Sequence, residues 1–266
     1  MSPEHKLYLK KRKRRNVLIW GLRIGVLALF VALWEILAHY EIIDPFIISS
    51  PSRIGKVISS LYRSGELWKH VSASLTETVA GFLIATVLGS GIAVLLWLSP
   101  VLRDVIEPYL ITLNSLPKIA LGPILIVWMG TGSKAIIFMA VLICIIITII
   151  SMLSGFISVD KEKIMLLQSM KASKWKILTK LVLPANIPTL LSVLKINVGL
   201  SWIGSIMGEY LSSKQGLGYL LVYGAQVFKL DLVMASTVIL CVLAGVMYAA
   251  VAIVERTVYR FFGNNK

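Results

Sequence analysis

Six residues in otherwise apolar stretches of the sequence have side chains that can contact a solute or break a helix. Lys195 is the most costly of them, because it lies about eleven residues beyond Pro184, which is about 16 Å along a helix. A charged side chain at the centre of a membrane costs at least about 2.5–3.5 kcal/mol unless it is paired or hydrated. Lys195 is therefore interpreted either as an attractor for an anionic solute or as a structural residue that snorkels or pairs with a carboxylate or carbonyl oxygen. The candidates for a path across the membrane are Asn114, Pro117, Lys195, Asn197, Ser201 and Glu209.

The other candidates also have two interpretations each. The side chains of Asn114, Asn197 and Ser201 either line a path or form hydrogen bonds between helices. Glu209, with Lys214 nearby, is an external gate, a docking contact or an ordinary charge at the membrane interface. The prolines at positions 108, 117 and 123 are expected to break or bend their helix, which gives either a packing kink or a pivot beside a pore.

The sequence carries none of the residue patterns that indicate catalysis, a metal centre or nucleotide binding. It has no HExxH motif, nucleophile elbow or paired-carboxylate pattern, and its three histidines are scattered. Cys144 and Cys241 both fall in apolar stretches and are interpreted as small buried residues. No GxxxxGK[ST] loop is present, so ATP is not expected to bind this chain in the P-loop manner. We predict no catalytic residue, no metal ligand and no cofactor bound by this chain.

The composition is that of a membrane protein. Apolar residues make up 57% of the 266 positions and charged residues 15%, against about 45–50% and about 25% in typical soluble domains. These fractions exclude a disordered chain and disfavour an ordinary soluble enzyme. The formal net charge of +14 fits either a nucleic acid or an anionic membrane surface as a partner. No aromatic platform or nucleic-acid motif accompanies the basic N-terminus, so we expect membrane lipid and no nucleic acid.

Six stretches are long and apolar enough to cross a bilayer, which takes about 20 residues of helix. No period-two alternation of the kind found in membrane barrels is present. Backbone N–H groups in hydrocarbon must bond within their own segment, so each stretch is expected to be helical. The sequence thus predicts an all-α, polytopic membrane protein. The six predicted spans are residues 17–38, 79–98, 105–128, 135–159, 187–208 and 232–254.

The basic N-terminus predicts how the chain threads the membrane. Residues 1–16 carry seven Lys and Arg side chains, and such a cluster stays on the cytoplasmic side. Six spans then return the C-terminus to the cytoplasm of a multi-pass protein in the cell membrane. The predicted organisation is a cytoplasmic N-terminus (1–16), a first transmembrane helix (17–38), an extracellular loop with short helices (39–71), a five-helix core (72–255) containing a cytoplasmic loop (160–187), and a cytoplasmic C-terminus (256–266).

The cytoplasmic loop is the one long loop predicted on the inner side. Its pattern predicts a short helix over about 161–170, a turn over 171–173 and a second helix over about 174–182. Lys176 and Lys180 are four residues apart, with apolar residues between them, which gives the second helix a polar and an apolar face. Spacing alone leaves two interpretations open: a basic loop that only determines topology, or a loop that contacts a partner.

This loop resembles the conserved cytoplasmic loop of binding-protein-dependent ABC importer permeases. That loop reads roughly EAA-xxx-G, then about nine residues, then a hydrophobic residue and Leu-Pro. Leu183-Pro184 supplies the last pair, and Ala172-Ser173-Lys174-Trp175 matches the run after the glycine. Met165-Leu166-Leu167 departs from EAA, and Lys171 stands where the family has glycine, the residue suited to a turn with positive φ.

The resemblance extends over about residues 49–255. Ser49-Ser50-Pro51-Ser52 resembles the start of the family's outer loop, and residues 116–123 with Trp128-Met129-Gly130 resemble its proline-broken helix. Gly199-Leu200-Ser201-Trp202, Glu209 and Gly216-Leu217-Gly218-Tyr219 resemble its fifth span and following loop, where the two glycines also read as a turn. The match is closest to the nitrate, sulfonate and taurine group, with its pyrimidine-precursor and riboflavin relatives.

The resemblance implies a fold, partners and a mechanism. The fold is that of a type I ABC importer permease. Its partners are a second permease subunit, identical or related, two cytoplasmic ATPase subunits that bind ATP and magnesium, and an extracellular or periplasmic solute-binding protein. A small solute is moved inwards by alternating access. The residues that the resemblance assigns to coupling with the ATPase are Leu167, Met170, Lys171, Ala172, Ser173 and Trp175.

Three other classes remain as alternatives. A secondary transporter works without an ATPase but usually shows inverted repeats, and no clear repeat is present. A membrane enzyme is disfavoured because the sequence lacks clusters of catalytic residues. A passive membrane scaffold requires no particular sequence pattern. The sequence does not identify the solute.

Overall fold

The computed structural model describes residues 3–263 and is built of helices joined by short turns, with no strand in that range. The ends of the two predicted tails, residues 1–2 and 264–266, lie outside the described residues. Five helices are long and apolar enough to cross a membrane. They are α1 (Pro3–His39), α4 (Glu66–Leu98), α7 (Ser133–Ile157), α11 (Ile187–Ser212) and α13 (Leu230–Gly263).

The sixth span is broken. Helix α5 (Pro100–Ser115) and the segment formed by η1 (Lys118–Leu121) and α6 (Gly122–Met129) meet at an angle of 87°. Pro117 lacks an N–H group and holds the preceding Leu116 in an extended conformation, which ends α5. The predicted break is thus confirmed at Pro117, whereas the helix continues through Pro108. Pro123 occupies the first turn of α6, where a missing N–H costs nothing.

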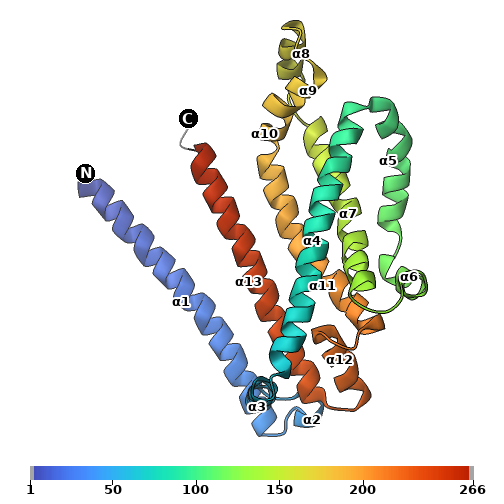
Figure 1. Ribbon diagram of the computed structural model, residues 1–266. Helices are drawn as coiled ribbons and strands as arrows, with labels where there is room; N and C mark the ends of the chain where they lie inside the picture. Colours follow the sequence, from blue (N-terminus) through green and yellow to red (C-terminus); the bar gives the residue numbers. More distant parts are fainter. Residues whose placement is uncertain (1–2, 264–266) are drawn as a thin grey trace.

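Helices α4, α7 and α11 form the centre of the bundle (Figure 1). Glycines of α4 and α11 let these helices approach α7 closely, as is common between helices in membranes. A Cβ atom added to Gly208 of α11 would lie 2.9 Å from the Cα of Ile136 of α7. Gly81 and Gly89 make the matching approach from α4, against Ala140 and Thr148 of α7.

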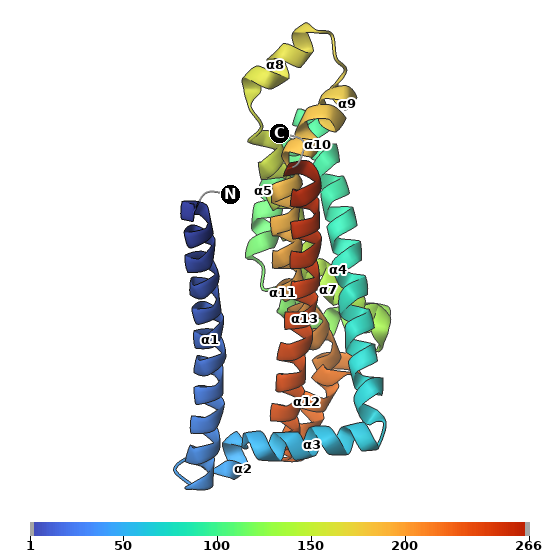
Figure 2. The same cartoon turned by 90° about the vertical axis from the view of Figure 1, so that its left-hand side faces the viewer.

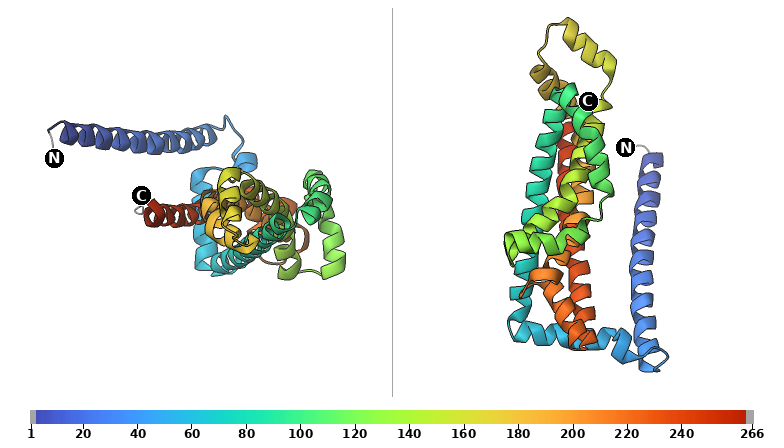
Figure 3. Two further views of the ribbon diagram at one scale, coloured as in Figure 1. Left: turned by 90° about the horizontal axis from the view of Figure 1, so that it is seen from above. Right: turned by 90° about the vertical axis from the view of Figure 1, so that its right-hand side faces the viewer.

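Helix α1 stands apart from this bundle (Figures 2 and 3). Its apolar window has no buried residue, and it connects to the rest through α2 (Pro45–Ile48) and α3 (Pro51–Arg63). The Glu35 carboxylate accepts a hydrogen bond from the backbone N–H of Ser52, at 2.9 Å. Helix α3 lies across one end of the bundle (Figure 2) and is tied to α13 by an ion pair between Arg53 and Asp231, at 2.8 Å.

Both termini lie toward the end of the bundle that carries α8 (Lys161–Ser169) and α9 (Lys174–Ile177) (Figure 1). The opposite end carries α2, α3 and α12 (Leu217–Gln226). This placement is the one that an even number of crossings requires. We refer to the end with α8 as the inner end and to the opposite end as the outer end, following the predicted threading.

Two segments differ from the sequence prediction. Gly216 lies in the predicted turn as the N-cap of α12, whereas Gly218 already belongs to this ten-residue helix. The second helix of the inner loop is α9 followed by a π-helical turn, η2 (Leu178–Val182), and by the short α10 (Leu183–Ala185). The outer loop contains the expected short helices, but α4 already begins at Glu66.

The close approach of α7 and α11 gives a direct test of the packing. Gly208→Ala is expected to lower the free energy of unfolding by about 1–3 kcal/mol, because the new methyl group meets the α7 backbone. Gly199→Ala on the same helix is the matched control, because nothing lies within 4 Å of its added Cβ. Thermal unfolding of the purified chain in detergent measures both. Equal midpoints for the two variants would contradict the packing described here.

Candidate functional site

The turn that ends α8 at the inner end has a defined hydrogen-bonding pattern. The N–H of Lys171 donates to the carbonyl of Gln168 at 2.8 Å, and the N–H of Ala172 donates to the carbonyl of Leu167 at 3.0 Å. These two bonds form a Schellman motif, which needs a left-handed residue at the position of Lys171. Lys171 adopts it, with a φ of 58°. The lysine therefore keeps the turn that the family builds with glycine.

The four apolar residues among the six predicted coupling residues divide into two groups by burial, whereas Lys171 and Ser173 are exposed. Leu167 and Ala172 pack against the apolar cluster at the inner end of the bundle, which includes Phe156. Met170 and Trp175 instead point away from it, with 70% and 60% of their surfaces exposed. The two apolar contacts anchor the turn, so the exposed pair is presented on a fixed support rather than on a loose loop.

Ser173 begins the next helix. Its hydroxyl accepts a hydrogen bond from the N–H of Lys176 at 3.3 Å, which makes it the N-cap of α9. The side chain of Lys174 donates to the carbonyl of Leu98 at 3.4 Å and so links the loop to the end of α4. The side chains of Met170 and Trp175, in contrast, are exposed.

Lys195 forms an ion pair with Glu255 of α13, with 2.6 Å between Nζ and Oε2. Pairing with a carboxylate was one of the two interpretations that the sequence left open. The residue that sequence reasoning missed is Glu255. A usable signal was that both residues lie at a similar depth in the membrane. Lys195 is about as far from the inner start of α11 as Glu255 is from the inner end of α13. A role for Lys195 in the path stays a prediction.

Asn197 lies at the centre of the three-helix core and is fully buried. Its Nδ2 atom donates to the hydroxyl oxygens of Thr86 of α4 at 3.1 Å and of Thr148 of α7 at 2.8 Å. The structure thus gives Asn197 hydrogen bonds between helices, and it gives the buried Ser201 a bond to the carbonyl of Val198 at 3.0 Å. Their predicted place along a path remains untested.

The remaining candidates lie away from this core. Asn114 and Pro117 are exposed at the break between α5 and η1, where the Asn114 carbonyl accepts a hydrogen bond from Lys118 Nζ at 3.1 Å. Glu209 lies near the outer end of α11 and is 1% exposed. The interpretation of Glu209 as an ordinary interfacial charge is therefore wrong. The six path candidates do not form a single cluster.

Glu209 belongs to a set of contacts that holds the start of α12. This helix lacks a capping side chain of its own, and three successive N–H groups donate to side chains of other helices. Gly216 donates to His70 Nδ1 at 3.0 Å, Leu217 to Ser74 Oγ at 2.8 Å, and Gly218 to Glu209 Oε2 at 2.6 Å. Gly216 has a φ of 105°, and a Cβ atom there would collide with the Glu209 carboxylate.

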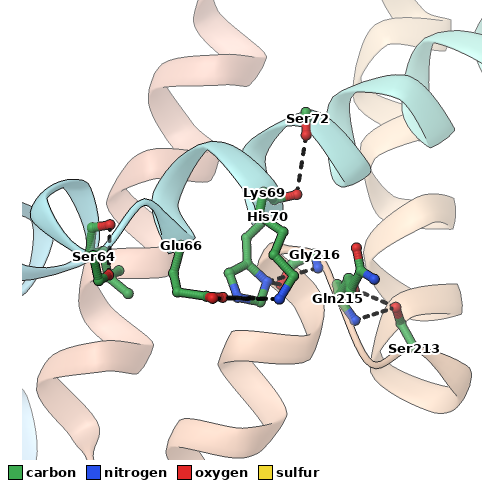
Figure 4. A network of polar contacts seen from close by, with 9 residues as sticks. Ser64, Glu66, Lys69, His70, Ser72, Ser213, Gln215 and Gly216 are labelled. Carbon is green, nitrogen blue, oxygen red and sulfur yellow. Dashed lines mark hydrogen bonds and ion pairs between the residues drawn. The ribbon is translucent and has the colours of Figure 1, made fainter.

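His70 joins this arrangement to the start of α4 (Figure 4). Its Nε2 atom lies 3.2 Å from a Glu66 carboxylate oxygen, and its ring stacks on Tyr219 of α12 with centroids 6.0 Å apart. Nδ1 lies 3.0 Å from the N of Gly216 and 3.1 Å from its carbonyl oxygen, and in the tautomer in which Nδ1 accepts from the N–H, Nε2 carries the hydrogen and donates to Glu66. Sequence reasoning missed His70 and Ser74, because their partners are backbone groups far along the chain.

The sequence family follows from comparison with known proteins. The family model for the binding-protein-dependent transport system inner membrane component matches residues 82–260. The chain belongs to this family. It is an ABC importer permease for small solutes, as the resemblance in the sequence predicted.

Curated relatives of this permease transport several kinds of solute. The taurine transport system permease protein TauC of Escherichia coli is 25% identical over 91% of this chain and 90% of its own length. The riboflavin transport system permease protein RibX of Chloroflexus aurantiacus is 26% identical over 91% and 90%. The formylaminopyrimidine transport permease protein ThiX of Halalkalibacterium halodurans is 29% identical over 72% and 76%.

Solved structures share the fold of this permease. A chain of the inward-facing MetNI methionine ABC transporter matches with a TM-score of 0.64 and 20% identity, covering 72% of this chain and 97% of its own length. A chain of a bacterial ABC transporter for alginate import matches with a TM-score of 0.63 and 14% identity, covering 94% and 99%. These likenesses confirm the predicted all-α, type I permease fold.

The left-handed conformation of Lys171 predicts a stabilising substitution. An L-residue pays about 1–2 kcal/mol in this conformation, whereas glycine adopts it freely. Lys171→Gly is therefore expected to raise the free energy of unfolding of the inner loop by about 1 kcal/mol. Lys171→Ala, which removes the amine but keeps the strain, is the matched control. Hydrogen exchange of the loop amides measures both, and equal protection in the two variants would contradict the assignment.

Proposed function

We propose that this chain is the membrane subunit of an ATP-driven importer and works as one of a pair of permease subunits. Two cytoplasmic ATPase subunits bind ATP and magnesium, and an external solute-binding protein delivers the solute. The solute crosses inwards by alternating access, with both termini of the chain in the cytoplasm. The observation that carries this proposal is the exposure of two large apolar side chains at the inner end, Met170 on the fixed turn and Trp175 at the start of α9.

The turn is suited to transmitting force. Exposed large apolar side chains are typical of contact with another protein, and Trp is common among the residues that dominate such contacts. A push on Met170 passes through the Schellman turn to Leu167 and Ala172, which pack on the inner apolar cluster. From Trp175, the chain continues through η2 and α10 directly into α11.

The solute belongs to the range handled by the relatives. Their names give taurine, aliphatic sulfonates, riboflavin and formylaminopyrimidine, and nitrate is a further candidate from the resemblance of the sequence. A secondary transporter, the alternative kept from the sequence, is not favoured because the family match is to components of binding-protein-dependent systems.

Met170→Asp and Trp175→Asp are expected to uncouple ATP hydrolysis from uptake. A carboxylate buried in an apolar contact costs several kcal/mol, so uptake should fall by at least about tenfold, which corresponds to about 1.4 kcal/mol. Uptake by proteoliposomes that contain the permease, its ATPase and its binding protein is measured together with phosphate release. Met170→Leu and Trp175→Phe, which keep the apolar surface, are the matched controls. Normal uptake by both Asp variants would count against the proposal.

Variants of the Lys195–Glu255 ion pair distinguish between the two interpretations of Lys195, as a structural residue or as part of the solute path. Lys195→Met leaves Glu255 unpaired and is expected to impair uptake under either interpretation. The exchange Lys195→Glu with Glu255→Lys restores a pair between α11 and α13, so it is expected to restore uptake if the lysine is structural. Uptake that stays lost in the exchanged protein, with a normal amount of folded protein in the membrane, would assign Lys195 to the solute path.

A further inference from the structure

Two buried carboxyl groups lie next to each other in the outer half of the bundle. Glu77 of α4 is 5% exposed and Glu209 of α11 is 1% exposed. Their side chains are within hydrogen-bonding reach of each other. Two carboxylates in such an environment repel each other, so a buried pair needs a positive partner or a proton.

No positive side chain fills this role within the described part of the chain. Every ion pair found there involves other residues, and none places a Lys, Arg or His nitrogen within 4 Å of Glu77 or Glu209. One oxygen of each carboxyl group, Oε2 of Glu77 and Oε1 of Glu209, is buried without a hydrogen-bond partner. Buried polar atoms in folded proteins are nearly always partnered, so these two oxygens call for a bound cation or a shared proton.

A hollow of about 310 Å³ reaches the Glu77 side of the pair. Glu77 forms part of its wall, together with the α6–α7 turn and the loop between α11 and α12. Hydroxyl groups gather there, and the Ser133 hydroxyl lies within hydrogen-bonding reach of Glu77. Lys214 lies on the wall of the same hollow and reduces the local negative charge. The residues lining it are Ala73, Glu77, Thr131, Gly132, Ser133, Ser212, Ser213, Lys214 and Gln215.

We propose that Glu77 and Glu209 form a binding site for a small monovalent cation that enters through this hollow from the outer side. The oxygen-only set of carboxylate and hydroxyl groups suits a hard cation. Two sources share this chemistry: a free metal ion such as Na⁺, and the primary ammonium end of a transported solute. The second source rests on the proposed function, because it makes the hollow a contact for the solute.

The neighbouring contacts define what the cation does. Glu209 Oε2 already accepts the N–H of Gly218 and so holds the start of α12. A cation between Oε1 of Glu209 and Oε2 of Glu77 joins this helix start to α4, and Ser133 adds the first turn of α7. The bound cation therefore fastens four helices together at the outer end. Its absence leaves two like charges between α4 and α11, which favours their separation.

The test uses the purified full-length chain in detergent, without ATPase or binding protein. Its thermal unfolding midpoint is measured in NaCl, in choline chloride, in taurine and in ethanesulfonate, at constant ionic strength and pH. A bound cation at ten times its dissociation constant lowers the unfolding equilibrium constant about elevenfold. We expect a saturable rise of the midpoint with Na⁺ over choline, or with taurine over ethanesulfonate, which lacks the ammonium group. The first result identifies a metal ion and the second a solute ammonium group.

Variants show whether the response belongs to this site. Glu77→Gln is expected to abolish the response, whereas Glu107→Gln, at an exposed carboxylate of α5, is expected to keep it. Glu77→Arg supplies a fixed positive charge beside Glu209, so it is expected to fold and to be insensitive to cations. This variant keeps the proposal testable if Glu77→Gln does not fold.

Two results would overturn the proposal. One is a midpoint that responds to no cation but falls as the pH rises, because a single shared proton then neutralises the pair. The other is a cation response that survives in Glu77→Arg, because the ion then binds elsewhere. Neither result bears on coupling to the ATPase, which uptake by the Met170 and Trp175 variants tests separately.

Discussion

Polar groups that lie away from water must find their partners inside the protein, and the architecture of this permease depends on that constraint. It makes every long apolar stretch helical, and it confines the one sharp break to a proline-containing segment. It also explains the polar contacts of the bundle. Asn197 joins three helices through hydroxyl groups, and Lys195 meets a carboxylate of α13. The same constraint makes the unpartnered oxygens of Glu77 and Glu209 informative.

The parts of the fold that depend on local patterns were predictable from the sequence. Length and hydropathy gave the spans, and the threading rule gave a consistent placement of the ends. The turn at Lys171 followed from its place in a recognisable loop, and the lysine there has the backbone conformation that glycine favours. Local patterns sufficed in these cases because the hydrogen bonds involved close within a few residues or within one helix.

The parts that were not predictable depend on contacts between distant segments. The sequence predicts a turn at Gly216 and Gly218 but not the helix α12 that follows, because the groups that cap this helix come from α4 and α11 and have no local signal near Gly216. Likewise, the sequence leaves an ordinary interfacial charge beside Lys214 as one interpretation of Glu209, because the burial of this residue requires the packing of α4, α7 and α12 around it. The two residues of the carboxyl pair, Glu77 and Glu209, are separated by about half of the chain length, and the pair has no signature in either helix alone.

Helix α1 is attached to the bundle in a way that has consequences for how such permeases diversify. It contacts the rest of its own chain through its outer end, near α2 and α3, and it contributes no residue to the three-helix core (Figure 3). A lineage can therefore lengthen, replace or lose this helix without repacking the centre of the protein. Its free flank can adapt to lipid composition or to a neighbouring subunit while the transport core stays unchanged.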